Sequence, residues 1–147
     1  MLFYSEKLLE KILENNPAIN ATGNGNCYVS SSYYSGSYGL WFNYIYSGSH
    51  YVIMPWQVNP EGASLSFWYY TSPWNTNIDI IRVHYSTTPD ISSLTEIGTG
   101  YSSASWDYVE IDLSGIEEDM IYIIFEQEGH DSNGSCIDDI KVNGITQ

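Results

Sequence analysis

"WDYVEIDL", residues 106–113, alternates between apolar and acidic side chains. The side chains of a β-strand point to opposite faces in turn, so Glu110 and Asp112 are expected to face water together. Val109, Ile111 and Leu113 share the other face and are expected to be buried. One buried face and one solvated face are typical of strands in antiparallel sheets. The stretch therefore predicts an antiparallel β fold.

The rest of the chain repeats this signal. "MIYIIFEQE" (120–128) is apolar on both faces, which predicts a strand in the middle of a sheet. Clusters of Gly, Asn, Ser and Pro separate runs of Val, Ile, Tyr, Trp and Phe. We predict strands near 27–33, 38–46, 50–57, 63–71, 77–86, 105–113, 119–128 and 135–142. This spacing predicts an all-β fold, a two-sheet antiparallel jelly-roll sandwich of the concanavalin A-like or galactose-binding-like kind.

Residues 5–14 allow two interpretations. "SEKLLEKILE" places four apolar residues at helical spacing behind Ser5, which predicts a short helix. The end of the same stretch, shortly before Pro17, is equally compatible with a first strand. The residues alone leave both alternatives open.

Charge limits the classes of partner. Four basic and 18 acidic residues give a formal net charge of −14. Nucleic acids and anionic membrane surfaces both reward Lys and Arg, so neither is an expected partner. Cations are the favoured partners of such a chain. We expect no membrane insertion, because the sequence contains no run of 18 apolar residues.

Composition points to an extracellular setting. Charged residues make up 15% of the chain, and Ser, Thr, Asn, Gly and 14 Tyr supply the polar surface, as in many extracellular β-proteins. The N-terminus is too acidic for a signal peptide. We therefore expect residues 1–147 to be one monomeric module of a larger secreted or cell-surface protein. Cys27 and Cys136 are either a disulfide in an oxidising compartment or two separate thiols.

Motifs for enzymatic chemistry are few. The sequence lacks a nucleophile elbow, a Walker A loop and a dinucleotide-binding fingerprint, and its three histidines show no zinc-site spacing. "DSNGSCID" begins like a calcium loop but has Cys136 where the EF-hand turn needs Gly, so Asp131 is interpreted mainly as a turn residue.

The catalytic alternative is a degenerate or unusual jelly-roll glycoside hydrolase that uses Glu110 and Asp112. Glu110 and Asp112 resemble the paired carboxylates of the E-x-D-x-x-E signature of β-glucanases. Gly115 stands where that signature has its general acid. Without an acid to protonate the leaving oxygen, the first step of double displacement is lost. The sequence therefore favours a protein without enzymatic activity.

The last predicted strand holds two adjacent aspartates in "CIDDIKV" (136–142). Strict alternation places Asp138 on the face of Ile140 and Val142, which is expected to be the core face. A buried carboxylate is costly unless it is neutralised, accepts several hydrogen bonds, or binds a cation. We therefore single out Asp138 as a metal-ligand candidate, with the capping of backbone amides as the alternative.

Several segments in order carry a family resemblance: "SGSYGLWFNY", "GASLSFWYY", "DIIRVHYSTTPDISSLTEIGTG", "WDYVEIDLSG", "MIYIIFEQEG" and "CIDDIKV". Over residues 11–142 they resemble the MAM-like jelly-roll modules of the cleaved-adhesin and choice-of-anchor J group of microbial surface proteins. The resemblance implies a surface module used for adhesion to proteins or glycans, often with structural calcium. It also implies that a Glu of the first strand meets the Asp pair of the last strand at the metal.

The resemblance thus assigns a calcium site to this chain. Its ligands would be Asp138, Glu14 in "KILENNP", and, less favourably, Asp139. The family's "FE" is "LE" here, and the tryptophan expected after the Pro is missing. Calcium would pin the first strand to the last and take no part in chemistry.

Aromatic residues outside the predicted core are candidates for ligand binding. Trp74 lies in the turn "TSPWNTN", Trp56 follows Pro55 near "NPEG", and Tyr70 lies near the end of the strand predicted at 63–71. Aromatic faces provide apolar contact for sugar rings, and neighbouring Asn and Tyr side chains provide hydrogen bonds. The expected partner is a glycan or a surface protein of a host or neighbouring cell.

Overall fold

The computed structural model describes residues 2–3, 27–30, 34 and 39–143. Within these ranges every regular element is a strand: β1 (Leu2–Phe3), β2 (Cys27–Ser30), β3 (Gly39–Phe42), β4 (Ser49–Val58), β5 (Ser64–Thr71), β6 (Ile80–Ser86), β7 (Thr95–Glu96), β8 (Asp107–Asp112), β9 (Ile121–Glu128) and β10 (Ser135–Asn143). The predicted all-β fold class is therefore confirmed.

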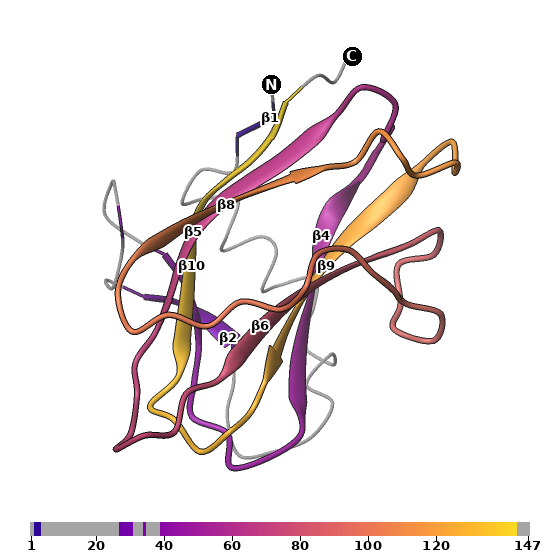
Figure 1. Ribbon diagram of the computed structural model, residues 1–147. Coiled ribbons are helices and arrows are strands. Elements are labelled where there is room, and N and C mark those ends of the chain that lie inside the picture. Colours follow the sequence, from indigo (N-terminus) through magenta and orange to yellow (C-terminus); the bar gives the residue numbers. More distant parts are fainter. Residues whose placement is uncertain (1, 4–26, 31–33, 35–38, 144–147) are drawn as a thin grey trace.

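The strands form two antiparallel sheets that lie face to face as two layers (Figure 1). In sheet A the order is β2-β3-β10-β5-β8, and β1 pairs with the end of β10 beyond β3. In sheet B the order is β4-β9-β6-β7. Neighbouring strands are mostly distant in sequence, as in a jelly-roll sandwich.

All eight predicted strands are present, and the ends that fall on described residues differ by a few positions. Residues 31–33 and 38 of the predicted strands lie outside the described residues. The two-residue strands β1 and β7 were not predicted, because so short a stretch carries no periodic signal. β9 lies between β4 and β6, which confirms the prediction of a central strand from 120–128. Residues 5–14, for which a helix and a strand were both considered, lie outside the described residues.

The core lies between the two sheets. Alternation in β8 places Val109 and Ile111 in this core and leaves Glu110 and Asp112 exposed, as predicted. The largest fully buried side chains come from both layers: Phe42, Phe67, Phe125, Leu40, Ile45, Met54, Leu65, Ile81, Leu113, Ile121 and Ile123. Their burial supplies the main driving force of folding.

A β-bulge in β10 reverses the predicted alternation of that strand. Asp138 pairs with Trp68 and Lys141 with Ser66, so two residues of β10 lie opposite Phe67 alone. The first of them, Asp139, has a φ of 49°, a left-handed conformation that Asp tolerates better than most residues. Ile137 and Ile140 consequently both belong to the core. The prediction that Asp138 faces the core is therefore wrong, and Asp138 lies on the outer face of sheet A.

Topology also decides between the two interpretations of the cysteines. β3 lies between β2, which carries Cys27, and β10, which carries Cys136. Two strand spacings amount to about 10 Å, beyond the roughly 7 Å that separates the Cα atoms of a disulfide at most. Cys136 is a buried thiol and not half of a disulfide.

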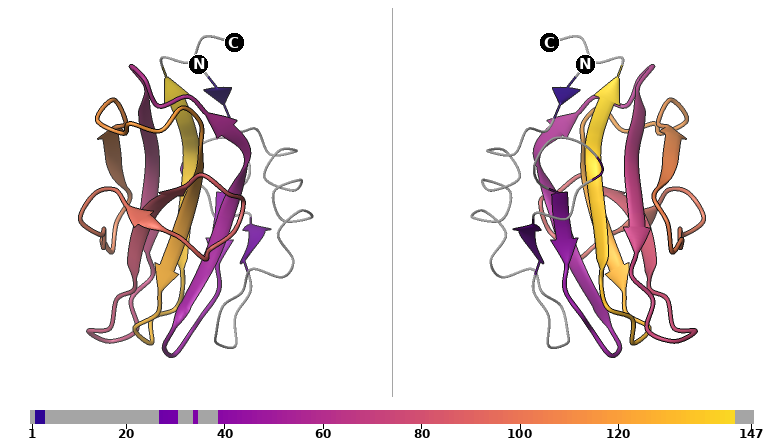
Figure 2. Two further views of the ribbon diagram at one scale, coloured as in Figure 1. Left: turned by 90° about the vertical axis from the view of Figure 1, so that its right-hand side faces the viewer. Right: turned by 90° about the vertical axis from the view of Figure 1, so that its left-hand side faces the viewer.

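Three turns gather at one end of the sandwich: 43–48 between β3 and β4, 72–79 between β5 and β6, and 129–134 between β9 and β10. Both views in Figure 2 place these turns at the lower end and β1, with the end of β10, at the upper end. No helix that could cross a membrane occurs in the part of the chain that the structure describes.

Candidate functional site

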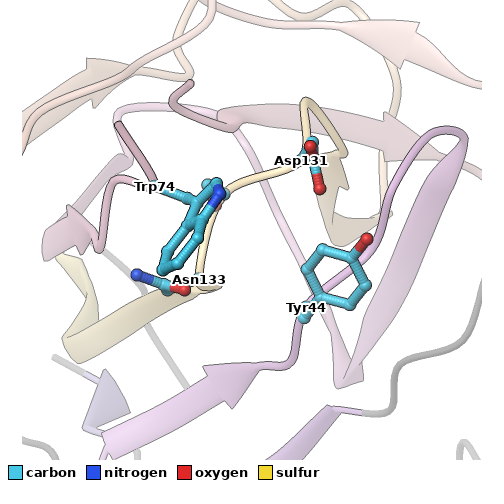
Figure 3. Close-up of a pocket in the computed structure, with 5 residues that line it drawn as sticks. Tyr44, Trp74, Asp131 and Asn133 are labelled. Carbon is cyan, nitrogen blue, oxygen red and sulfur yellow. The ribbon is translucent and has the colours of Figure 1, made fainter. Parts of the chain in front are cut away.

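A pocket opens among these three turns. Its cavity volume is about 300 Å³. Residues of all three turns line it: Tyr44, Trp74, Asp131, Ser132 and Asn133. Figure 3 shows the rings of Trp74 and Tyr44 on opposite sides of the space, with the Asp131 carboxylate on the side of the Tyr44 hydroxyl. We call this the loop pocket.

Trp74 stands at the start of a tight turn. Its backbone N–H donates to Asn77 O at 3.1 Å, and the Asn77 N–H donates to Trp74 O at 2.9 Å. Between them Asn75 has a φ of 54°, which Asn tolerates better than most residues. This turn holds Trp74 outside the core with 56% of its surface exposed. The predicted ligand-binding candidate Trp74 is therefore an accessible indole in a pocket.

Asp131 and Tyr44 form the polar side of the loop pocket. The Asp131 carboxylate lies on the side of the Tyr44 hydroxyl, and its hydrogen-bonding influence is the largest of the causes that raise the pKa of Tyr44. Asn77 Nδ2 also donates to Asp131 Oδ2, at 3.5 Å. Asp131 has a φ of 58°, which Asp tolerates better than most residues. Tyr44 itself is 38% exposed.

Asn133 completes the lining beside the indole. Its Nδ2 donates to Pro73 O at 2.9 Å, and its backbone N–H donates to Ser72 O at 2.8 Å. Because the amide nitrogen is used in this way, the Asn133 oxygen is oriented as an acceptor. These two hydrogen bonds help to fix the turns that carry Trp74 and Asn133 to each other.

A buried polar network lies beneath the loop pocket. Gln127 Nε2 donates to Asn43 O at 3.1 Å and to Asp79 Oδ2 at 2.7 Å. Asp79 Oδ1 accepts the backbone N–H of His130 at 2.7 Å. Asn43 precedes Tyr44, His130 precedes Asp131, and Asp79 ends the turn of Trp74. The network therefore ties the three turns to one side chain of β9.

His50 is the remaining member of this network. Its Nδ1 lies 2.8 Å from Gln127 Oε1. Since both protons of the Gln127 amide are donated elsewhere, Oε1 accepts, and His50 Nδ1 carries the proton. Among the described residues, His50 Nε2 is a buried polar side-chain atom without a hydrogen-bond partner. His50 is therefore a buried side chain that supports Gln127.

The other two predicted ligand-binding residues lie elsewhere. Tyr70 is half-buried on the outer face of sheet A, where its ring centroid is 4.7 Å from that of Trp106 and 6.0 Å from that of Trp41. Trp56 belongs to β4, in a stretch of three residues that lies opposite Ile123 alone; its side chain is outside the described part of the structure. The structure does not bring Trp74, Trp56 and Tyr70 together.

Asp138, the first metal-ligand candidate, has its two carboxylate oxygens hydrogen-bonded to amides. The Tyr34 N–H donates to Oδ2 at 2.8 Å, and the Asp139 N–H donates to Oδ1 at 2.7 Å. Asp138 is only 6% exposed, so its carboxylate needs hydrogen bonds to compensate for the loss of water, and these two bonds supply part of them. Capping of backbone amides was the predicted alternative to a metal. Glu14 lies outside the described residues, among which no group of three metal-binding side chains occurs. The calcium site stays a prediction.

Glu110 and Asp112, the catalytic alternative, both lie exposed on the edge strand β8. The Tyr108 hydroxyl donates to Glu110 Oε2 at 3.1 Å. Hydrogen bonds from the side chain and backbone of Ser114 lower the pKa of Asp112. Neither carboxylate is among the lining residues of the loop pocket.

A buried carboxylate lies on the outer face of sheet B. Glu126 Oε1 is 2.7 Å from His84 Nε2, and its Oε2 accepts hydrogen bonds from Ser49 and, at 3.4 Å, Tyr51. Burial, the largest single influence, raises the pKa of Glu126, but the hydrogen bonds from His84 and Ser49 outweigh it and the net pKa is lowered. These contacts join β4, β6 and β9, so we infer that Glu126 stabilises the folded protein.

The sequence reasoning missed Tyr44 and Asn133 and interpreted Asp131 mainly as a turn residue. Tyr44 lies in the turn cluster "FNYIYSGS" and the other two residues in "DSNG", and no spacing rule connects the two clusters. One signal was available, because "DSNG" and "TSPWNTN" both combine turn residues with groups able to hydrogen-bond a ligand.

No protein-family model matches the sequence, and no curated protein matches it either. Solved structures with the same fold do exist. TmCBM61, solved in complex with β-1,4-galactotriose, is 18% identical, with a TM-score of 0.58 over 97% of this chain and 98% of that one. The CBM22-1 xylan-binding domain of Paenibacillus barcinonensis Xyn10C is 10% identical, with a TM-score of 0.56 over 82% and 81%.

The glycoside hydrolase domain of Endo-D from Streptococcus pneumoniae R6 has a TM-score of 0.62 at 15% identity over 86% of this chain. This chain spans only 21% of that one, so the likeness concerns one part of a larger enzyme. At such identities these comparisons establish the fold alone, and the resemblance to MAM-like modules stays a prediction. The chain has the jelly-roll β-sandwich fold that carbohydrate-binding modules adopt.

Proposed function

We propose that this protein is a non-catalytic carbohydrate-binding module whose ligand site is the loop pocket. One observation carries the proposal: the exposed Trp74 indole and the Tyr44 ring lie across a pocket from each other, with the Asp131 carboxylate on one side of it. The carbohydrate-binding modules that share this fold support the carbohydrate-binding class of function.

The chemistry of the loop pocket suits a sugar ring. A pyranose has an apolar face of C–H groups, which gains free energy by covering an exposed aromatic ring. Its hydroxyl groups need hydrogen-bonding partners at the ring edge, and the Asp131 carboxylate and the Asn133 oxygen are both acceptors. A few fixed polar groups beside apolar contact area are typical of small-ligand sites.

The same placement argues against catalysis. Glu110 and Asp112 lie on an exposed edge strand outside the loop pocket, and Gly115 stands at the position of the missing general acid. A glycosidase needs its two carboxyl groups to flank a bound glycosidic bond. We therefore propose that these side chains keep strand β8 soluble.

The wider setting extends the proposal. We propose that the module works outside the cell or at the cell surface, where glycans are accessible, and that it attaches a larger protein to them. A protein ligand in the same pocket remains the alternative, and the experiment below separates the two. The proposal does not depend on calcium, which has its own test.

The proposal is tested by isothermal titration calorimetry with soluble β-1,4-galactan and xylan. We expect at least one of them to bind the wild-type protein. Trp74→Ala should weaken that binding at least tenfold, since a tryptophan that becomes buried beneath a ligand often carries a large share of the binding energy. Tyr108→Ala is the matched control, because Tyr108 is also an exposed aromatic residue, 47% accessible, but lies on sheet A. It should bind like the wild type.

Two outcomes would overturn this assignment. Binding lost in Tyr108→Ala but kept in Trp74→Ala would move the site to the outer face of sheet A. Absence of binding to both polysaccharides and to a wider glycan array would exclude the carbohydrate function. Circular dichroism of each variant establishes that a change in affinity is not a loss of fold.

A further inference from the structure

We infer that the loop pocket selects uncharged sugar units over carboxylated or sulfated ones, and that Asp131 is the residue that sets this preference. The inference rests on the proposed function, because it concerns the ligand of the same pocket. It goes further by naming the chemical class of sugar and the side chain that discriminates.

Asp131 is held as a fixed acceptor. The hydroxyl of Tyr44 and Nδ2 of Asn77 both approach its carboxylate, and its backbone N–H donates to Ile45 O at 3.3 Å. A carboxylate has about four acceptor positions, so it can also accept hydrogen bonds from a ligand. Hydroxyl groups of a neutral sugar supply such donors. An ionised carboxylate or sulfate on a sugar supplies none and would meet Asp131 as a like charge.

The basic side chains that the structure describes do not compensate this charge. In the described ranges the Lys and Arg residues are Arg82 and Lys141. Arg82 is engaged by Glu96, at 2.9 Å, and by Glu128. Lys141 pairs with Ser66 near the opposite end of β10. An anionic sugar in the loop pocket would therefore face the carboxylate of Asp131 without a salt-bridge partner among these residues.

His130, which directly precedes Asp131, is a further side chain that could carry a positive charge. However, its Nε2 lies 3.1 Å from Glu128 Oε1, and its side chain does not line the loop pocket. Its backbone N–H is donated to Asp79 in the core. His130 is thus directed to the outer face of sheet B, and Asp131 sets the charge at the pocket.

The experiment compares matched ligands at 0.15 M NaCl, where charges more than about 8 Å away are largely screened. The probes are β-1,4-galactotriose and cellotriose, each paired with an analogue whose terminal C6 is oxidised to a carboxylate. For each neutral probe that binds, we expect the oxidised partner to bind at least tenfold more weakly, which corresponds to about 1.4 kcal/mol.

The variant Asp131→Asn tests whether Asp131 is the residue that causes the preference for neutral sugars. Asn keeps the shape and tolerates the left-handed backbone at this position, whose φ is 58°. We expect the ratio of neutral to oxidised affinity to fall to within about threefold, whatever happens to the absolute affinity. Glu61→Gln, which removes one negative charge from the exposed turn before β5, should leave the ratio of the wild type unchanged.

The outcomes separate this inference from the proposed function. Neutral trisaccharides that bind no more tightly than the oxidised ones would overturn the inference and leave the glycan site standing. A preference that persists in Asp131→Asn would overturn the role of Asp131. If neither trisaccharide pair binds, and the polysaccharides also fail, both the inference and the proposed function fall.

Discussion

Gln127 donates a hydrogen bond of 2.7 Å to Asp79 in the core beneath the loop pocket, where both side chains are fully buried. The same Gln127 amide reaches the carbonyl next to Tyr44, and the same Asp79 carboxylate accepts the amide next to Asp131. The shape of the loop pocket therefore depends on side chains that no ligand touches.

We predict that Gln127→Glu destabilises the protein by about 3–5 kcal/mol at neutral pH, the range for an uncompensated buried charge. The substitution keeps the shape of the side chain but sets a second carboxylate against Asp79 and removes the donor to Asn43 O. Urea denaturation followed by tryptophan fluorescence measures the change. Glu117→Gln, on an exposed loop, is the control and should stay within about 0.5 kcal/mol of the wild type.

Protonation of Glu126 at low pH should reduce the free energy of unfolding of the protein. Because the folded-state pKa of Glu126 lies below its ordinary value, its contribution is fully present above the unfolded pKa of about 4.3 and is lost as pH falls through the folded value. We expect Glu126→Gln to reduce stability at pH 7 by about 1–3 kcal/mol. The difference between the two proteins should shrink as pH falls below about 4.3; a difference that is constant from pH 7 to pH 3 would contradict the assignment.

The bulge at Asp139 predicts an unusual order of substitutions. Its φ of 49° is favourable for Gly and costly for β-branched residues. Asp139→Gly should therefore be within about 1 kcal/mol of the wild type, whereas Asp139→Val should lose about 2 kcal/mol or more. Thermal unfolding ranks the three proteins. Equal stability of the Gly and Val variants would show that the left-handed conformation is not maintained in solution.

Calcium binding is tested by unfolding in EDTA and in excess calcium. If Glu14 and Asp138 share a calcium ion, a concentration a hundred times the dissociation constant should add about 2.7 kcal/mol. For a domain of this size we expect a rise of roughly 5–10 °C in Tm, absent from Asp138→Asn. An unchanged Tm would leave the amide hydrogen bonds from Tyr34 and Asp139 to account for Asp138 without a metal.

Most of the fold could be predicted from the local periodicity of the sequence. Alternation in β8 and the doubly apolar sequence of β9 depend only on neighbours along the chain, so the faces of β8 and the central position of β9 were both predicted correctly. The bulge at Asp139 was not predictable from alternation, because one inserted residue changes the face of every side chain after it. That single residue is why Asp138 was placed on the wrong side of sheet A.

The candidate site was only partly predictable for a different reason. Trp74 could be identified because an aromatic residue in a turn cluster is conspicuous on its own. Tyr44, Asp131 and Asn133 become a site only when the order β4-β9 and β3-β10-β5 brings three turns to one end of the sandwich. Strand order depends on long-range pairing, which one sequence does not encode in any short motif.

The antiparallel pairing of Leu2 with Val142 sets the direction in which the pocket can be presented. β1 and the end of β10 lie at the end of the sandwich opposite the three turns (Figure 2), whose residues line the loop pocket. A fusion partner, an affinity tag or a surface linkage that is joined before β1 or after β10 would therefore leave the loop pocket on the far side, open to solvent. The molecule can be immobilised by either end and still offer its pocket to a polymer in solution.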